Sequence, residues 1–115
     1  MKTHIRLLLA AGAMAPWFLS ACSGRRSEPL RGALDISDPK VAHGQVVYMS
    51  KCDKCHPGGD AGLGPSINNK PLPGFLVSFQ TRHGLGAMPA FKEDELPKAD
   101  LDDVVAYLKA LRRNG

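Results

Sequence analysis

The chain has 115 residues, enough for one domain. Charged residues make up 23% and aromatic residues 6%, which fits a soluble globular protein and argues against a disordered chain or a membrane-spanning one. The net charge of +4 includes Lys2 and Arg6, which lie in residues 1–21. The rest of the chain has 13 basic residues and 11 acidic ones. This basic surplus is too weak to support nucleic-acid binding.

Residues 1–21 have the order of a secretory signal peptide. A basic start precedes an apolar run from Leu7 to Leu19, which is too short to span a membrane comfortably. The run ends in Leu19-Ser20-Ala21-Cys22, which resembles the lipobox of bacterial lipoproteins, a family in which the cysteine is lipidated and becomes the mature N-terminus. We expect a lipid anchor on Cys22; an ordinary signal cleaved after Ala21, or an uncleaved anchor, is the alternative.

A polar stretch without periodicity follows, and it contains Gly24, Pro29 and Gly32. We interpret residues 22–37 as a flexible, lipid-anchored linker and residues 38–115 as the folded domain. The domain opens with a predicted helix from Asp38, an N-cap, through about Lys51.

The motif Cys52-Asp53-Lys54-Cys55-His56 comes directly after this helix. C-x-x-C-H is the haem attachment pattern: two thiols three residues apart can form thioethers with two vinyl groups, and the adjacent histidine ligates the iron. A zinc site would need further Cys or His ligands, and only His43 and His83 remain in the mature chain. A redox-active C-x-x-C would need a βαβ context, which the sequence does not offer. A structural disulfide would leave His56 unexplained. The motif therefore predicts one covalent haem.

Residues 57–71 hold four glycines and three prolines and are predicted to form a loop around a cofactor. A second helix is predicted from Pro73 to His83, with Gly84 as its stop and with Phe75, Leu76 and Phe79 facing inward. We find no convincing strand pattern, so the predicted fold class is all-α.

Met88, in a glycine-rich loop and followed by Pro89, is the candidate for the second axial iron ligand. A thioether ligand suits electron transfer, whereas a lone methionine is more often core filling. Met49 lies one turn before Cys52 and is expected near the haem edge. His83 is a weaker alternative, whose ordinary role would be at a helix C-terminus.

The last helix has the clearest pattern. Its apolar stripe is joined by aspartates in the first turns and basic residues in the last, as the helix dipole favours. The stripe comprises Leu101, Val104, Val105, Leu108 and Leu111.

Residues 38–113 resemble class I c-type cytochromes, a family of small all-α domains with three to four helices around one covalent haem c. The resemblance implies that Met88 ligates the iron and that the carbonyl of Pro65, in Gly64-Pro65, accepts a hydrogen bond from His56. It also matches Gly44 and Tyr107 to a helix crossing at which the missing side chain lets the aromatic ring pack close. Pro97, where the family often has Ser or Thr, is a departure that affects only the helix start.

The resemblance implies an electron carrier rather than an enzyme. We expect a membrane-tethered shuttle between redox proteins, on the periplasmic side of the inner or outer membrane of a Gram-negative bacterium. Lys54 and Lys92 are candidates for steering a partner, although ordinary surface lysines are the simpler interpretation. The alternatives are a fixed subunit of a dehydrogenase or reductase complex and, with less support, a haem-based sensor or peroxidase-like protein.

Overall fold

The computed structural model describes residues 32–114, and within them it contains three α-helices and one short 3-10 turn. The elements are α2 (Pro39–Lys51), η3 (Pro57–Gly59), α3 (Gly74–His83) and α4 (Lys98–Asn114). No strand occurs among these residues, only an isolated bridge between Leu85 and Met88. The all-α prediction is confirmed. The predicted signal peptide, Cys22 and most of the linker lie outside the described residues.

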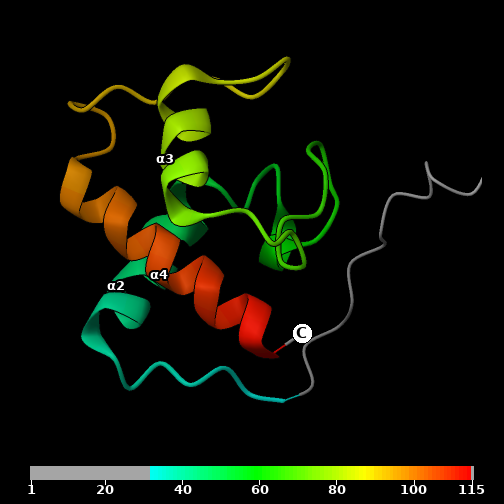
Figure 1. Cartoon of the computed structure of the whole chain (residues 1–115), viewed down its shortest axis with the longest axis vertical. Helices are drawn as coiled ribbons and strands as arrows, with labels where there is room; N and C mark the ends of the chain where they lie inside the picture. The colour runs from blue at the N-terminus through cyan, green and yellow to red at the C-terminus, as the bar shows by residue number, and fades with distance from the viewer. Residues whose placement is uncertain (1–31, 115) are drawn as a thin grey trace, which may run out of the picture.

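α2 and α4 form the frame of the domain, and α3 packs on α4 (Figure 1). α2 begins as predicted: the Asp38 side chain accepts a hydrogen bond from the Lys40 amide at 2.9 Å, and Pro39 is the first helical residue. α4 begins just after Pro97, whose carbonyl accepts from the Leu101 amide at 3.0 Å. All five residues of the predicted α4 stripe are buried. No helix in residues 32–114 is both long and apolar enough to cross a bilayer.

The two frame helices cross at Gly44. A Cβ placed on Gly44 would lie only 2.0 Å from the carbonyl oxygen of Asp103, so this glycine lets the backbones touch. The predicted close crossing at Gly44 is present, and the atoms nearest to an added Cβ belong to the α4 backbone. The Tyr107 ring packs close to α2 on the Tyr48 ring, with 5.1 Å between the ring centroids.

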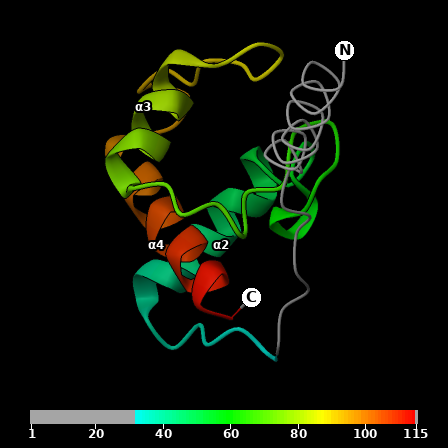
Figure 2. The ribbon, with the colours of Figure 1, turned by 45° about the vertical axis from the view of Figure 1, so that its right-hand side comes forward.

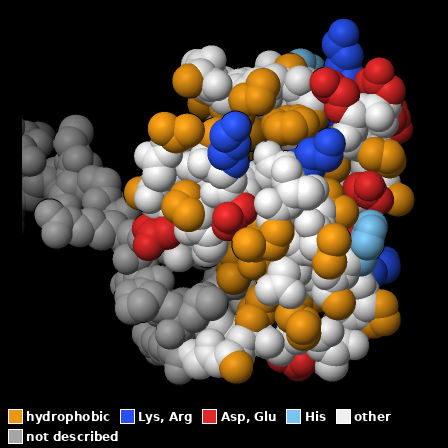
Figure 3. Space-filling view, turned by 180° about the vertical axis from the view of Figure 1, so that it is seen from behind, with side chains coloured by type: hydrophobic (Ala, Val, Ile, Leu, Met, Phe, Trp, Pro, Cys, Tyr) orange, Lys and Arg blue, Asp and Glu red, His pale blue; other side chains and the backbone are white. Residues whose placement is uncertain are grey.

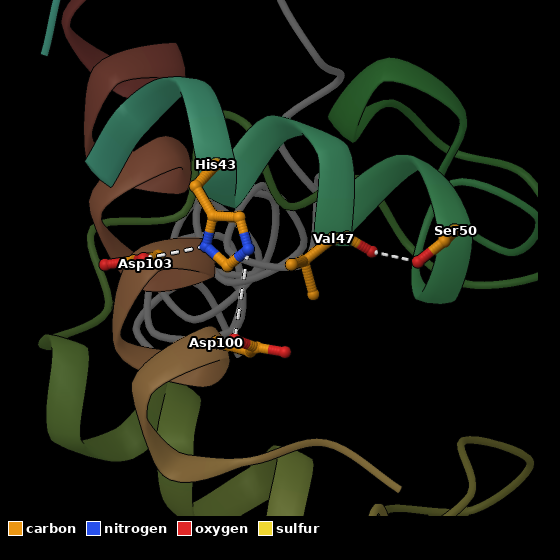
Figure 4. Close-up of polar contacts among 5 residues, drawn as sticks. All are labelled: His43, Val47, Ser50, Asp100 and Asp103. Carbon is orange, nitrogen blue, oxygen red and sulfur yellow. Dashed lines mark hydrogen bonds and ion pairs between the residues drawn. The ribbon is translucent and has the colours of Figure 1, made fainter. Parts of the chain in front are cut away.

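A polar contact marks the solvent side of the same crossing (Figure 4). His43 Nδ1 lies 2.9 Å from Asp103 Oδ2, and His43 Nε2 lies 4.0 Å from Asp100 Oδ1. The His43 side chain is half exposed, so this contact fixes how the helices are paired more than it stabilises them, at about 1 kcal/mol or less.

α3 ends at Gly84, whose φ of +71° is the conformation that glycine adopts readily. The prediction that Phe75, Leu76 and Phe79 face inward is wrong: their exposed fractions are 71%, 39% and 59%. Residues on α3 advance by about 100° each, and the ridge nearest α4 starts at Gly74, where an added Cβ would lie 2.9 Å from Val105 Cγ1. The phenylalanines therefore lie beside this ridge and remain largely exposed.

Candidate functional site

The two cysteines of the C-x-x-C-H motif lie in the turn that ends α2. Cys52 is the C-cap of the helix, and its carbonyl accepts hydrogen bonds from the amides of Cys55 (3.1 Å) and His56 (2.9 Å). Both thiols are free and partly buried. Burial, with smaller contributions from Cys55 and Asp53, raises the pKa of the Cys52 thiol to about 11, so this sulfur stays protonated at neutral pH. Two reduced thiols on one tight turn are available for covalent attachment.

The imidazole of His56 is buried and held by one nitrogen. Nδ1 lies 2.7 Å from the Pro65 carbonyl oxygen. Since a carbonyl can only accept, Nδ1 must carry the proton, which leaves the lone pair on Nε2. Nε2 makes no hydrogen bond with any residue in 32–114. This geometry agrees with the contact expected between His56 and Pro65, and it leaves one nitrogen free to ligate a metal.

The backbone around His56 is also fixed. A Cβ on Gly64 would lie 2.3 Å from His56 Cε1, so the imidazole rests directly on the Gly64 backbone. The Gly64 amide donates to the Cys55 carbonyl at 2.9 Å. On the other side, the buried Tyr48 hydroxyl donates to the His56 carbonyl. Tyr48 was not among the residues predicted for the site, although its position four residues before Cys52 was an available signal.

Met88 lies in a short hairpin after α3. The amide of Leu85 donates to the Met88 carbonyl at 3.1 Å, and the amide of Met88 donates to the Leu85 carbonyl at 3.0 Å. Gly84 and Gly86 have φ of +71° and +58°, which lets the chain turn this sharply. Figures 1 and 2 show this loop extending from the end of α3 toward the side of the molecule that holds residues 52–72. Met88 is half-buried.

The alternative ligands, His83 and Met49, are both exposed to solvent, whereas Met88 is half-buried. His83 Nδ1 donates to the Phe79 carbonyl at 2.8 Å, and the two rings stack with centroids 4.1 Å apart. His83 thus satisfies the end of its own helix, as its ordinary role predicts. Met49 is 54% exposed on α2. Within residues 32–114, no three His, Cys, Asp or Glu side chains form a group that could hold a metal ion by themselves.

The residues present fit a haem. Besides two thiols, an imidazole with a free nitrogen and a thioether, the domain leaves large apolar side chains uncovered in the segments that carry His56 and Met88 and on α3. Leu63 is 81% exposed, Leu85 68% and Leu76 39%. Figure 3 shows hydrophobic side chains open to solvent across the face turned away from the viewer in Figure 1. A flat apolar macrocycle would cover surface of this kind.

A hollow of about 720 Å³ lies between α3 and α4, but it belongs to another part of the molecule. Phe75, Phe79 and Lys109 line it, and neither the cysteines nor His56 nor Met88 does.

The two lysines considered for steering a partner are both exposed. Lys54 lies in the turn after Cys52, and Lys92 follows the Met88 loop.

Comparison with known proteins finds relatives that match the segment containing the C-x-x-C-H motif and Met88. The family model described as "Cytochrome C oxidase, cbb3-type, subunit III" matches residues 39–108. Cytochrome c6 of Bryopsis maxima is 33% identical over 75 residues, covering 56% of this chain and 84% of the relative. Cytochrome c6 of Synechocystis sp. (strain ATCC 27184 / PCC 6803 / Kazusa) is 34% identical over 77 residues, or 59% and 62% of the two chains.

A third relative aligns over almost the whole chain. It is the "4-cresol dehydrogenase [hydroxylating] cytochrome c subunit" of Pseudomonas putida, 26% identical over 107 residues, which cover 93% of this chain and 86% of the relative. No solved structure matches the chain significantly.

Proposed function

We infer the function from the family: the chain belongs to the c-type cytochromes, in the family described as cytochrome c oxidase, cbb3-type, subunit III. Members of this group carry covalent haem c, transfer electrons and work with redox protein partners. Haem c supplies one reversible one-electron step at its iron. We propose that this chain is a monohaem carrier tethered to a membrane by lipid.

In this proposal Cys52 and Cys55 form the two thioethers, and His56 is the proximal ligand. The observation that carries it is the His56 imidazole, with Nδ1 bound to the Pro65 carbonyl 2.7 Å away and Nε2 free. The hydrogen bond to the Pro65 carbonyl makes the imidazole a stronger electron donor to a metal and fixes the orientation of its ring. The ring is buried, 8% exposed, so its surroundings restrict its movement.

Met88 is proposed as the distal ligand. A thioether raises the reduction potential and closes the iron to outside ligands, which suits a carrier rather than an enzyme or a sensor. The paired hydrogen bonds between Leu85 and Met88 support this role, because they hold the methionine in one backbone conformation.

Carbon monoxide tests the ligation. Added to the reduced haem protein, it should bind poorly to the wild type and readily to Met88→Leu, which keeps the size of the side chain and removes the sulfur. Met49→Leu is the matched control and should stay closed. Ready binding of carbon monoxide by the wild type would overturn the carrier proposal and favour a ligand-binding sensor or peroxidase-like protein.

The tether is proposed from residues outside the described part of the chain. Residues 1–21 would be removed, Cys22 would carry the lipid, and residues 22–37 would link it to the domain of residues 38–115 on the periplasmic side of the inner or outer membrane. Tethering would raise the local concentration near membrane-bound partners. Mass spectrometry of the mature protein should find a lipid-modified Cys22 as its first residue; a different first residue, or an unmodified Cys22, contradicts the anchor.

A fixed subunit of a dehydrogenase or reductase complex is the second candidate. It is favoured by the relative whose printed name is a dehydrogenase cytochrome c subunit, since that match covers most of both chains. Purification in mild detergent separates the two proposals. A shuttle should elute alone, whereas a subunit should elute with an oxidoreductase in a constant ratio.

A further inference from the structure

One side chain of α3, that of Arg82, binds the segment that follows the Met88 loop. Arg82, in the last turn of α3, is partly buried, and its Nη1 donates to the carbonyls of both Phe91 (3.0 Å) and Leu96 (2.7 Å). These acceptors lie 9 and 14 residues further along the chain. One guanidinium therefore joins the end of the helix to two separate points beyond Met88.

The two residues whose carbonyls Arg82 binds, Phe91 and Leu96, are themselves held in place by other contacts. The Phe91 amide donates to the Thr81 carbonyl at 2.9 Å, so Phe91 is held to α3 through both its amide and its carbonyl. Leu96 is 1% exposed, and its amide donates to the Lys92 carbonyl at 2.9 Å. The hairpin of residues 84–90 thus starts and ends on the same turn of α3, and Arg82 closes its base.

An ordinary surface role does not account for this arrangement. Within residues 32–114, Arg82 forms no ion pair with a carboxylate. A favourable interaction with the helix dipole alone would need only a positive charge in the last turn. Both bonds come from one guanidinium nitrogen, which reaches further from the backbone than a lysine ammonium and holds its N–H groups in a rigid plane.

We propose that Arg82 is a positioning residue that holds the Met88 loop against α3 and so keeps the methionine available as an iron ligand. This inference rests on the proposed His56/Met88 ligation. Without Arg82 the loop should open more often, because two carbonyls lose a charged donor while Met88 itself is unchanged. The iron should then become accessible to an outside ligand for a larger fraction of the time.

The test is carbon monoxide binding by the reduced, haem-loaded full chain, well below the unfolding temperature. Arg82→Gln keeps a polar side chain but shortens it and removes the charge, and it should raise carbon monoxide affinity by about tenfold or more over the wild type. Arg82→Lys keeps the charge and restores a donor, so it should fall between the two. Arg113→Gln, an exposed arginine in the last turn of α4, is the control and should match the wild type.

The outcomes separate the two proposals. If Met88→Leu opens the iron but both Arg82 variants stay as closed as the wild type, the positioning role is wrong and the ligation stands. If the wild type binds carbon monoxide readily, the ligation fails and the positioning role fails with it. Should Arg82→Gln not accumulate as a folded protein, Arg82→Leu, which removes every donor, replaces it, and carbon monoxide affinity equal to that of the wild type overturns the positioning role.

Discussion

The His56 imidazole is confined by three different kinds of contact. Pro65 accepts from Nδ1 at 2.7 Å, the Gly64 backbone supports the ring, and the Tyr48 hydroxyl holds the His56 carbonyl. An axial ligand that cannot rotate keeps its bond direction while the iron changes charge, so less reorganisation accompanies electron transfer. The contacts of Gly64 and Tyr48 can be tested separately.

Gly64→Ala tests the support beneath the ring. An added Cβ would lie 2.3 Å from His56 Cε1, so the imidazole or the loop must move. We expect a loss of about 1–3 kcal/mol in unfolding free energy, and a higher reduction potential as the Pro65 contact weakens and the imidazole donates less. Potentiometry and denaturant unfolding of the haem protein measure both. Gly32→Ala, where an added Cβ has no neighbour within 4 Å, should change neither; an unchanged potential in Gly64→Ala would mean that the ring does not depend on this support.

Tyr48→Phe tests the hydroxyl through pH. Burial is the main cause that raises the pKa of the Tyr48 phenol above its ordinary value, and burial also raises that of Tyr107. The unfolded chain ionises its tyrosines from about pH 10 while the folded chain keeps them neutral, so this contribution to stability is complete below pH 10 and is lost as the pH rises above it.

Unfolding of the reduced protein, followed from pH 7 to 11, separates the two tyrosines. Tyr48→Phe should lower stability by about 1–3 kcal/mol at pH 7, because the His56 carbonyl loses its donor. Both Tyr48→Phe and Tyr107→Phe should show a shallower decline above pH 10 than the wild type. A Tyr48→Phe curve parallel to the wild type above pH 10 would show that this phenol is not protected by the fold.

Among the helices, the crossing of α2 and α4 decides how the site is built, since α2 ends in the cysteine turn. By helix propensity alone, Gly44→Ala would stabilise α2 by about 1 kcal/mol. In the folded protein we expect it to lower the free energy of unfolding by about 1–3 kcal/mol instead, because the new Cβ would lie 2.0 Å from the Asp103 carbonyl oxygen and force the helices apart. Val46→Ala, an exposed position on the same helix, should stay within about 0.5 kcal/mol of the wild type in denaturant unfolding. A stabilised Gly44→Ala would contradict the close crossing.

Local signals predicted the elements well and their partners less well. The Asp38 cap, the Gly84 stop and the α4 stripe depend on neighbours within one or two turns, so the sequence was sufficient for them. Which backbone meets Gly44, and which carbonyls Arg82 binds, depends on how the helices pack. For the same reason a ten-residue helix with apolar residues on two ridges did not reveal which ridge faces α4.

At the scale of the whole molecule, the domain has a small core and much uncovered apolar surface. Within residues 32–114, eleven hydrophobic residues are buried and nine large ones are exposed. The buried set comes mainly from α2 and α4, so the loops that carry the ligand candidates contribute little apolar packing of their own. A domain of this size is marginally stable from its own core. Covalent haem would supply apolar surface where the protein lacks it.

The double variant Cys52→Ala with Cys55→Ala tests this dependence, since it removes both attachment points and leaves His56 in place. We expect the full chain to lose covalent haem and to show a broad unfolding transition, with α3 and the Met88 loop poorly protected in amide hydrogen exchange. α2 and α4 should retain more protection, because their contact does not need the cofactor. Met88→Leu, which keeps the attachment, should retain the cooperative transition in circular dichroism. If the double variant unfolds as cooperatively as the wild type and protects α3 equally, the exposed apolar residues are not organised by haem and the fit proposed for them is wrong.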